Sequence, residues 1–404
     1  MAARGHQGVR ADSMKKSLQV LHVISGIDRA DGGPTLALLG LARGLARLHV
    51  EVSVVATPRA SECDSIEEDL RECGVRVRLG EFRGRALGQS SVLRELLTKE
   101  IGRADVVHIH ALWEEVQRQA ATISRQRRTP FVVRPCGLLD PWSMAQHRLK
   151  KRLYLELRLR RCLNAASAMH FSTSMEEERA RALRIQAPAI IEPNGIDFDE
   201  FQNPPPPGSF RRRSNIDEGV PVVLFLGRMH PKKGLDLLIP AFAKGAPSNA
   251  VLAIVGSGDA DYEAELRRLV SALGIERRVK FAGFLRGQDR VAAYADSNLF
   301  VLPSYSENFA NTVLESLAAG TPVIVSDQVG LHAEVDSSMV GGVVPVTLDA
   351  LTEEIRRWLI DAQRRDLARA RAAKFLKPYD VNCVANRWLQ RYREFTCPAS
   401  GEAA

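Results

Sequence analysis

Residues 299–325 read LFVLPSYSENFANTVLESLAAGTPVIV, a stretch that begins and ends with a short run of apolar residues. Between these runs, the apolar residues after Thr312 recur at helical spacing, and Gly320 and Pro322 would end a helix. Asn311 or Thr312 is the expected N-cap, because such side chains accept hydrogen bonds from the first backbone amides. The stretch therefore predicts a strand, a loop, a short helix and a second strand, the repeating unit of a helix-covered parallel sheet.

Two glutamates, Glu307 and Glu315, lie eight residues apart across the junction between this loop and its helix. If every step between them were helical, the rise would separate them by about 12 Å. A glycosidase pair would lie at roughly 5 to 9.5 Å, so a shared reaction at one bond is not expected. The spacing favours one extended ligand held at two points, with a helix N-terminus between them available to an anion.

The same alternation of strands and helices fills most of the chain. Its first unit is an apolar strand at 18–24, a Gly32-Gly33-Pro34 turn, a leucine-rich helix and a strand at 52–55. Further strands are expected at 75–79, 106–110, 131–133, 168–171, 222–226, 251–255 and 279–281, and further helices at 92–101, 113–125, 149–163, 175–183 and 381–396. This pattern predicts an α/β protein with two doubly wound, Rossmann-like domains that face each other across a cleft.

The pattern breaks at a proline-rich stretch, NPPPPG at 203–208, which is followed by three arginines. Proline favours an extended, semi-rigid spacer, so a domain boundary is expected there. The predicted division is a disordered leader at 1–17, an N-terminal domain at 18–200, a linker at 201–213, a C-terminal domain at 214–375, and a C-terminal helix and tail at 376–404 that is free to cross back to the N-terminal domain.

Composition places the chain among cytoplasmic globular proteins. Of its 404 residues, 45% are hydrophobic and 26% are charged, and the six cysteines are scattered without zinc-like spacing. The first residues have no signal-peptide core, and no apolar run reaches the roughly 18 residues of a membrane span. The formal net charge of +8 suits an anionic partner such as a nucleotide, a phospholipid head group or a nucleic acid, without choosing among them.

A basic loop, GRMHPKKG at 227–234, follows one predicted strand and precedes a helix, where open α/β sheets bind ligands. Arg228 offers a planar fork of donors and Lys233 a point charge, a pair suited to a diphosphate. A solvated basic turn is the alternative. The turn at Gly256 occupies the equivalent place after the next strand, and it is either a second ligand-binding turn or a tight connection.

Two further features lie at ends of predicted strands in the first half. Gly32 and Gly33 let the backbone approach a ligand closely, although a tight connection would need them as well. His108 and His110 share one face of a strand, and His110 lies at its carboxyl end, within reach of the cleft. A structural role is the alternative for both histidines. Two Asp-x-Asp triplets, at 197–199 and 259–261, are interpreted as helix-start residues, so no metal site is expected.

Residues 146–161, QHRLKKRLYLELRLRR, carry seven basic side chains and one acidic one, with leucines spaced by four. Such a helix can lie on an anionic membrane surface or hold a phosphorylated lipid. The side chains expected to do so are Arg148, Lys150, Lys151 and Arg152. The alternative is an ordinary surface helix that packs its leucines inward, and nucleic acid is less favoured because no stacking platform or docking motif accompanies the charge.

Taken together, the motifs make the chain similar to the retaining glycosyltransferases of family four, which have the two-domain GT-B fold. The resemblance runs from Leu18 to about Glu334. It rests on three motifs in the right order: the glutamates of SENFANTVLESLAAGTPVI, the GRMHPKKG loop and the EPNGID junction.

That resemblance implies roles for single residues in a hexosyl-type transfer from a UDP- or GDP-sugar. Glu307 would contact the donor sugar, Glu315 the ribose, Arg228 and Lys233 the diphosphate, and His110 the reacting carbon and the acceptor. The other implied donor-binding residues are Gly32, Gly33, Gly256, Phe284, Leu285, Asn308, Phe309, Ala310, Asn311 and Thr312. Family members often have glycine at the positions of Asn308 and Ala310, so the shape of the sugar pocket is left open.

The family mechanism is a front-face substitution with retention, in which the departing phosphate helps to take the acceptor's proton. It needs donors that stabilise the leaving group, and neither a cofactor nor a catalytic metal is expected. Two alternatives stay open: a nucleotide-sugar epimerase or phosphorylase on the same fold, and a non-catalytic module that binds lipids or polyanions.

The stretch RPCGLLDPW at 134–142 resembles a subgroup found among bacterial exopolysaccharide and lipopolysaccharide enzymes. This likeness implies a saccharide acceptor linked to polyprenyl diphosphate. The basic helix would then face the inner surface of the plasma membrane, and no nucleic acid partner is expected.

Overall fold

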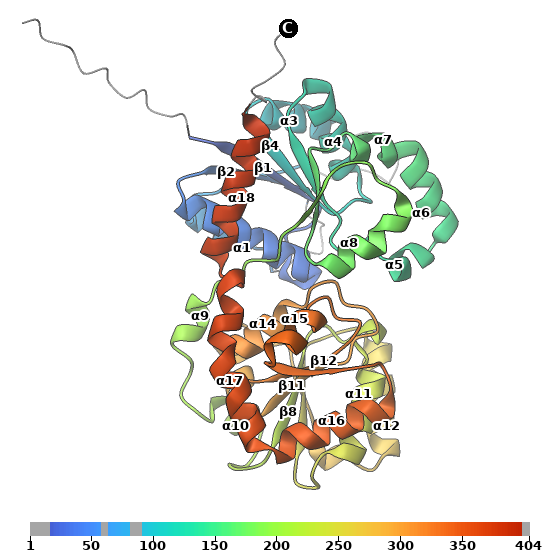
Figure 1. Cartoon of the computed structure of the whole chain (residues 1–404), viewed down its shortest axis with the longest axis vertical. Coiled ribbons are helices and arrows are strands. Elements are labelled where there is room, and N and C mark those ends of the chain that lie inside the picture. Colours follow the sequence, from blue (N-terminus) through green and yellow to red (C-terminus); the bar gives the residue numbers. More distant parts are fainter. Residues whose placement is uncertain (1–16, 58–63, 81–90, 398–404) are drawn as a thin grey trace, which may run out of the picture.

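The computed structural model describes residues 17–57, 64–80 and 91–397 of the chain. Nearly all of the predicted leader, 1–16, and the last part of the predicted tail, 398–404, lie outside the described residues. Two α/β domains lie one above the other, with the N-terminal domain uppermost in Figure 1. Each domain is built on its own parallel sheet, which confirms the predicted fold class.

The N-terminal sheet has seven parallel strands in the order β3-β2-β1-β4-β5-β6-β7. These strands are β1 (Gln19–Ile24), β2 (Glu51–Ala56), β3 (Arg76–Leu79), β4 (Val106–His110), β5 (Phe131–Arg134), β6 (Ala168–Phe171) and β7 (Ala189–Ile191). In register, His22 of β1 is the partner of His108, and His110 is the partner of Arg134. The strands of this sheet are mostly buried apolar runs, which are typical of parallel strands with both faces covered.

Helices cover both faces of this sheet because successive strand residues point to opposite sides. On one face, Val106 of β4 packs with α1 and α2, whereas its neighbour Val107 packs with α3 and α4 on the other face. The helices of this domain are α1 (Gly33–Arg47), α2 (Glu67–Glu72), α3 (Ser91–Ile101), α4 (Glu115–Arg127), α5 (Pro141–Ala145), α6 (Arg148–Tyr154), α7 (Arg160–Asn164) and α8 (Ser174–Ala180). A π-helical turn at Leu155–Leu159 joins α6 to α7, inside the helix that was predicted at 149–163.

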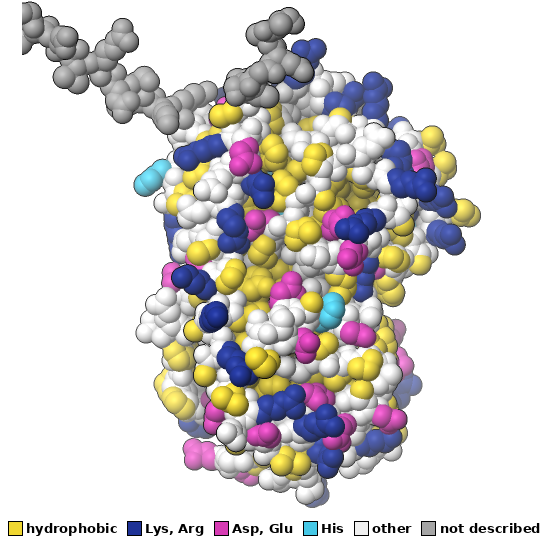
Figure 2. All heavy atoms as spheres, viewed as in Figure 1, with side chains coloured by type: hydrophobic (Ala, Val, Ile, Leu, Met, Phe, Trp, Pro, Cys, Tyr) yellow, Lys and Arg dark blue, Asp and Glu magenta, His cyan; other side chains and the backbone are white. Residues whose placement is uncertain are grey.

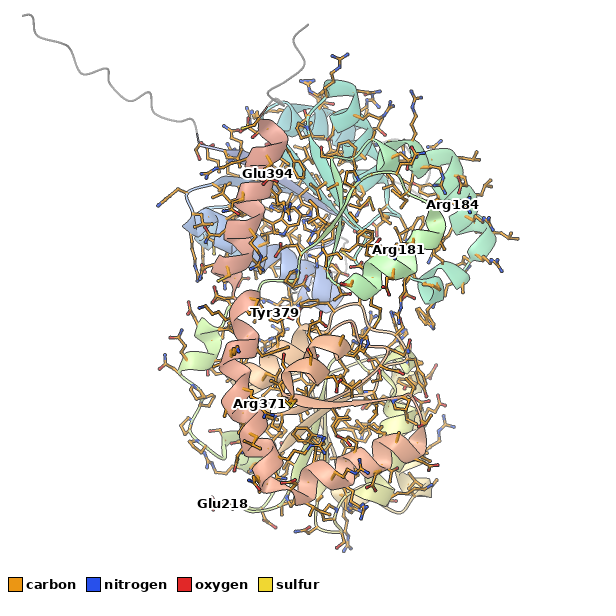
Figure 3. All side chains as sticks on the ribbon, in the orientation of Figure 1. Arg181, Arg184, Glu218, Arg371, Tyr379 and Glu394 are labelled. Atoms are coloured by element: carbon orange, nitrogen blue, oxygen red, sulfur yellow. The ribbon has the colours of Figure 1, made fainter. Side chains whose placement is uncertain are left out.

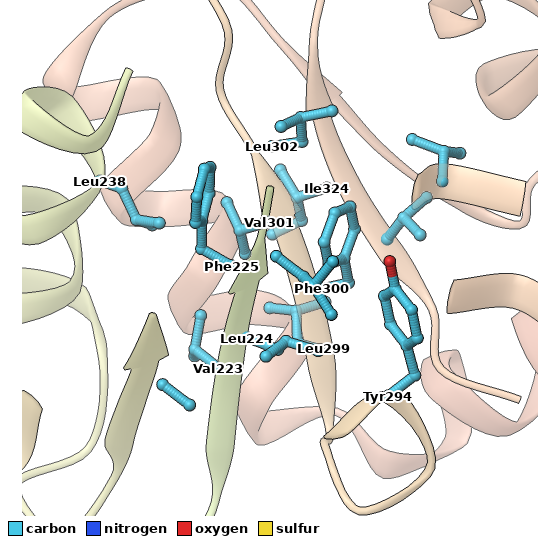
Figure 4. Close-up of a cluster of buried hydrophobic side chains, with 14 of the residues drawn as sticks. Val223, Leu224, Phe225, Leu238, Tyr294, Leu299, Phe300, Val301, Leu302 and Ile324 are labelled. Carbon is cyan, nitrogen blue, oxygen red and sulfur yellow. The ribbon is translucent and has the colours of Figure 1, made fainter. Parts of the chain in front are cut away.

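The C-terminal sheet has six parallel strands in the order β10-β9-β8-β11-β12-β13. They are β8 (Val222–Leu226), β9 (Val251–Val255), β10 (Val279–Gly283), β11 (Leu299–Leu302), β12 (Val323–Ser326) and β13 (Gly341–Val344). Figure 4 shows the centre of this core, where the ring of Phe300 stands edge-on to that of Tyr294 at 5.7 Å and Phe225 lies toward Leu238.

Helices flank this sheet as well. They are α11 (Leu235–Gly245), α12 (Ala260–Ala272), α13 (Gly287–Ala295), α14 (Asn311–Ala318), α15 (His332–Ser338), α16 (Leu348–Ile360) and α17 (Ala362–Leu376). Helix α11 packs against α12 and α16, and α14 packs against α13 and α17. The single buried cluster they enclose is the core of the C-terminal domain.

The predicted linker at 201–213 differs from a free spacer. It contains the end of α9 (Asp199–Gln202) and the whole of α10 (Ser209–Arg213), and Phe201 and Phe210 are buried in the C-terminal core. The carboxylate of Asp296 accepts hydrogen bonds from the backbone amides of Gly208 and Phe210, both at 2.7 Å. The segment therefore belongs to the surface of the C-terminal domain.

The last helix, α18 (Val381–Thr396), returns to the N-terminal domain. Tyr379, labelled in Figure 3, lies between the domains, and the backbone of Ile196 bonds to both Tyr379 and Val381. Helix α18 then packs closely on α1, because a Cβ atom at Gly44 would lie 2.8 Å from that of Ala385. Within the described part of the chain, no helix is both long and apolar enough to cross a membrane.

Candidate active site

The loop before α14, residues 306–310, is called the Glu307 loop here. Its last residue, Ala310, precedes the helix in the left-handed conformation (φ 72°, ψ 72°), and no side chain caps the helix. The prediction that Asn311 or Thr312 is the N-cap is therefore wrong. The Asn311 side chain is turned away because its Oδ1 accepts a hydrogen bond of 2.7 Å from Nδ2 of Asn194, a residue of the N-terminal domain.

Glu307 forms an ion pair with Lys233 of the basic loop, residues 227–234, and the two side chains are 18% and 23% exposed. Burial by itself would raise the pKa of Glu307, but the ammonium groups of Lys233 and Lys232 outweigh it and hold the pKa below its ordinary value. The backbone amide of Glu307 donates to the carbonyl of Gln328 at 3.0 Å. The carboxylate is therefore ionised and fixed beside the start of α14.

The basic loop follows β8 and contains a single 3-10 turn at Pro231–Lys233. It packs on the turn after β9, where a Cβ atom at Gly256 (φ 138°) would lie 1.9 Å from the carbonyl oxygen of Gly227. Loop packing thus accounts for Gly256, as the tight-connection alternative proposed. Arg228 is exposed at the surface of the same loop.

Glu315 lies one turn inside α14 and is buried. Its Oε1 accepts a 2.8 Å bond from Arg290, and its Oε2 accepts a 3.0 Å bond from the hydroxyl of Tyr294, both on α13. Arg290 also pairs with Glu200 of α9 at 2.6 Å. The charge of Glu315, more than any other contact, raises the pKa of Arg290.

Arg290 and Tyr294 are functional candidates that sequence reasoning missed. They stand four residues apart on a helix, which is ordinary spacing for one helical face. No motif marks them, and only the packing of α13 against α14 brings them to Glu315.

The remaining residues predicted for the donor site differ in accessibility. Phe284 is 53% exposed, whereas the side chains of Leu285 and Phe309 belong to the core of the C-terminal domain. At the start of α1, Gly32 has φ 81°, and a Cβ atom at either Gly32 or Gly33 would meet nothing within 4 Å. The backbone at this helix N-terminus is therefore open to a ligand.

His110 lies with His22, His108 and His170 in a fully buried cluster on the α18 side of the N-terminal sheet. Nε2 of His110 is 2.9 Å from Nδ1 of His22, and the rings of His108 and His110 stack at 4.6 Å. This stacking confirms that His108 and His110 share one face of the strand. His110 is directed into the protein and has no exposed surface, so its catalytic role stays a prediction.

Hydrogen bonds within this cluster fix two of its tautomers. His170 must donate from Nε2, because its partner there, at 2.8 Å, is the carbonyl oxygen of Glu192. Its Nδ1 is then an acceptor, so His108 donates to it from Nε2 at 3.2 Å. Nδ1 of His108 in turn accepts from the hydroxyl of Tyr392, a residue of α18, at 2.7 Å.

The cluster has the ligand number of a metal site, since one nitrogen each from His22, His108 and His110 lies within 4.8 Å of the others. Burial, followed by the charge of Arg134, lowers the pKa of His22 to about 3. Burial also lowers the pKa values of His108 and His110 well below the usual range. The hydrogen bonds within the cluster and the positive charge of Arg134 favour a stack of neutral histidines over a bound metal cation.

The basic helix around α6 departs from the ordinary surface helix that was its alternative interpretation. Leu149, Leu153 and Leu157 are 84%, 61% and 71% exposed, and only Leu155 and Leu159 pack inward. Of the four cations predicted for membrane or acceptor binding, Arg148, Lys150 and Arg152 are exposed. Lys151 is not available, because its Nζ donates to the carbonyl of Ser143 at 2.6 Å and lies 5.6 Å from the centre of the Trp113 ring.

Comparison with known families assigns both domains. A family described as Glycosyl transferases group 1 matches residues 208–375, and one described as Glycosyl transferase 4-like domain matches residues 32–195. The chain is a family-four glycosyltransferase. The predicted family and the predicted class of enzyme are thereby confirmed.

Curated relatives of this glycosyltransferase match over most of its length. An uncharacterised glycosyltransferase of Methanocaldococcus jannaschii is 29% identical over 90% of this chain and 95% of its own. A D-inositol 3-phosphate glycosyltransferase of Salinispora tropica is 28% identical over 90% of this chain and 81% of its own.

Solved structures of other proteins have the same two-domain fold. HepE of Anabaena, solved in complex with UDP and glucose, superposes with a TM-score of 0.77 at 20% identity, over 93% of this chain and all of its own. WaaG, involved in lipopolysaccharide biosynthesis, superposes with a TM-score of 0.69 at 18% identity, over 92% of this chain and 99% of its own. These likenesses establish the GT-B fold of this glycosyltransferase, and the roles of single residues stay predictions.

Proposed function

We propose that this glycosyltransferase moves a sugar from a nucleotide-diphosphate donor to a saccharide acceptor with retention of the anomeric configuration. The observation that carries the proposal is the ion pair between Lys233 and Glu307 beside the N-terminus of α14, with the exposed Arg228 on the same basic loop. A helix N-terminus and two cations suit a diphosphate, and a fixed carboxylate suits sugar hydroxyls. HepE, which has the same fold, was solved in complex with UDP, and this supports a nucleotide-diphosphate donor.

In the proposed step, the bond between the anomeric carbon and the β-phosphate oxygen breaks, and the bond to the acceptor oxygen forms on the same face. The acceptor's proton passes to the departing phosphate oxygen. Arg228, Lys233 and the amides that begin α14 would stabilise the charge that develops on the leaving group. Glu307 holds Lys233 in position before the donor arrives. Glu315, already fixed by Arg290 and Tyr294, would accept hydrogen bonds from the ribose.

The acceptor is proposed to be a saccharide carried on polyprenyl diphosphate at the inner face of the plasma membrane, in the synthesis of a cell-surface polysaccharide. The exposed leucines and cations of α6 support this part of the proposal, because a helix with this surface binds an anionic bilayer. Hydrophobic and basic side chains alternate along the outer edge of the upper domain in Figure 2, at the place of α6.

A thermal-shift screen with UDP- and GDP-sugars tests the donor, since a ligand at a hundred times its Kd stabilises the folded state by about 2.7 kcal/mol. With the donor found, Glu307→Gln should lower transfer by about a hundredfold or more. The matched control is Glu353→Gln, which removes an exposed charge from α16. Full activity of Glu307→Gln, or of Arg228→Ala combined with Lys233→Ala, would contradict the assigned roles.

The alternatives give different results in the same preparation. An epimerase would convert the sugar nucleotide without an acceptor, which NMR would detect. A phosphorylase would need inorganic phosphate in place of the nucleotide. A non-catalytic module would bind lipid equally well after loss of Glu307 and Glu315.

A further inference from the structure

The stretch RPCGLLDPW, Arg134 to Trp142, has no role in the transfer described above. It connects β5 to α5 in the N-terminal domain and lies against the C-terminal domain. We propose that this stretch, called the docking turn here, positions the Glu307 loop and the basic loop of the C-terminal domain for donor binding. Four of its residues carry the contacts, and each contact leads to a different part of the donor site.

Arg134 begins the docking turn. Its guanidinium is buried and donates to Oδ1 of Asn194 and, at 3.1 Å, to the hydroxyl of Ser172. The amide nitrogen of Asn194 donates in turn to Oδ1 of Asn311, the first residue of α14. Since the guanidinium satisfies the amide oxygen, only the NH₂ group can face Asn311. The docking turn thereby sets the orientation of the Asn311 side chain at the start of α14.

Gly137 makes the second contact. Its φ is 75°, and a Cβ atom would lie 3.1 Å from the Cβ of Asn308. The side chain of Asn308 therefore faces the docking turn of the other domain. The carboxylate of Glu176 holds the amide of Gly137 at 2.7 Å, and Thr173 donates to the carbonyl oxygen of Asn308 at 3.3 Å. Both sides of this contact are thus fixed by hydrogen bonds.

Asp140 makes the third contact, and it is mostly buried. Its Oδ2 accepts from Arg179 at 2.8 Å and from the hydroxyl of Ser306 at 3.3 Å. Arg179 also donates, at 2.9 Å, to the side-chain oxygen of Gln328. The backbone carbonyl oxygen of Gln328 accepts a hydrogen bond from the backbone amide of Glu307. Asp140 therefore contacts the side chain of Ser306 directly and is linked through Arg179 and Gln328 to the backbone amide of Glu307.

Trp142 makes the fourth contact. Lys232 Nζ lies 5.0 Å from the centre of its indole ring, and the ring of His230 stands edge-on to it at 6.2 Å. Lys232 immediately precedes Lys233, the partner of Glu307. A cation over an indole is attracted by the ring, so Trp142 restrains the turn that carries Lys233.

These contacts make the donor site depend on a segment of the opposite domain. Charged groups that stabilise a leaving group act best when they are already in place, because no free energy is then needed to orient them. Within the C-terminal domain, hydrogen bonds of Glu307 to Gln328 and Gly330 already hold the Glu307 loop. The docking turn adds restraints from the opposite domain, so Asp140 and Trp142 are positioning residues for Glu307 and Lys233.

The test uses the full chain and the variants Asp140→Asn, Trp142→Ala and Trp142→Phe. The matched control is Asp105→Asn, because Asp105 accepts a 2.8 Å bond from the amide of Gln19, as Asp140 does from the amide of Trp142, but it lies at the opposite end of the sheet. Amide hydrogen exchange in the nucleotide-free chain is expected to rise about tenfold at residues 228–234 and 306–312 in Asp140→Asn and Trp142→Ala, the effect of losing one hydrogen bond to a charged group or one cation–π contact. Trp142→Phe keeps an aromatic face and should recover most of the protection.

A second measurement is the affinity for UDP and GDP by calorimetry, which rests on the proposed function. The same two variants should bind the preferred nucleotide several-fold more weakly, and Asp140→Asn combined with Ser306→Ala should bind no more weakly than Asp140→Asn alone. Unchanged exchange in both loops would overturn the positioning role, as would exchange that rises throughout the N-terminal sheet. If the unaltered chain binds neither nucleotide, the proposed donor fails, and the exchange measurement still decides the role of the docking turn.

Discussion

Asn308 and Ala310 are the two positions where the Glu307 loop departs from the glycines common in its family. The side chain of Asn308 faces Gly137 of the other domain, so its departure from glycine serves the contact between domains. Ala310 keeps the left-handed conformation that glycine would adopt without strain (φ 72°). Neither side chain needs to enter the sugar pocket. Asn308 and Ala310 would therefore change the shape of the pocket only through the path of the backbone.

Ala310→Gly should stabilise the C-terminal domain. Glycine removes the left-handed strain, which costs roughly 1–2 kcal/mol. Its greater freedom in the unfolded chain offsets up to about 1 kcal/mol of that gain. The expected net gain in the free energy of unfolding is about 0.5 kcal/mol, measured by urea denaturation. Ala319→Gly, at the other end of α14 with φ −78°, is the control and should destabilise instead. A loss of stability in Ala310→Gly would show that the strain is absent.

Arg290→Ala should destabilise the C-terminal domain by about 3 kcal/mol, because it leaves the carboxylate of Glu315 buried with only Tyr294 as a partner. Combining it with Glu315→Gln should restore part of the loss, since the uncompensated charge is then gone. Urea denaturation measures both variants. A double variant that loses the sum of the two single effects would contradict this account.

At the scale of elements, the sequence predicted the strands best where apolar runs are continuous. The runs at 222–226 and 251–255 coincide with β8 and β9. Strand β13, which begins Gly341-Gly342, was missed because glycine gives no strand signal. The N-cap of α14 was wrong because Asn194, 117 residues away, takes the Asn311 side chain. Contacts of that kind depend on how the two domains pack together, so the spacing of residues within one segment of the sequence does not predict them.

The membrane surface of α6 can be tested with vesicles. Each cation near an anionic bilayer contributes about 1 kcal/mol, so changing Arg148, Lys150 and Arg152 to Gln should weaken binding to phosphatidylglycerol vesicles by about a hundredfold. Changing Leu149, Leu153 and Leu157 to Ser should weaken it as well, and high salt should not rescue that variant. Sedimentation with vesicles measures both.

The control for this experiment neutralises three exposed cations in and just after α3, Arg94, Lys99 and Arg103, which lie on a different surface. If this control loses as much vesicle binding as the α6 variant, net charge alone accounts for the attraction. Equal binding to phosphatidylcholine vesicles would also contradict a role for the cations.

At the scale of the whole molecule, the two domains should respond differently to acid. Burial lowers the folded-state pKa of His22, His108, His110 and His170, all in the N-terminal domain, whereas an unfolded histidine titrates near its ordinary value of about 6.5. The unfolded chain therefore binds more protons as pH falls through this range, and stability is lost below about pH 6.5.

The expected loss is about 2 kcal/mol for each buried histidine at pH 5, and the N-terminal domain should unfold first. Denaturation at pH 7.5, 6 and 5, followed separately for each domain by hydrogen exchange, measures the effect. A C-terminal domain that loses as much stability as the N-terminal one would contradict the prediction.

The return of α18 to the N-terminal domain has a consequence for synthesis of the chain. Trp388 and Tyr392 complete one face of the N-terminal core and contact His170 and His108, yet they leave the ribosome after the whole C-terminal domain. The C-terminal domain, whose buried cluster ends at Tyr379, is complete before them. The N-terminal domain, although it is made first, is therefore the second to finish folding, and until α18 has been made it exposes an apolar face that chaperones recognise.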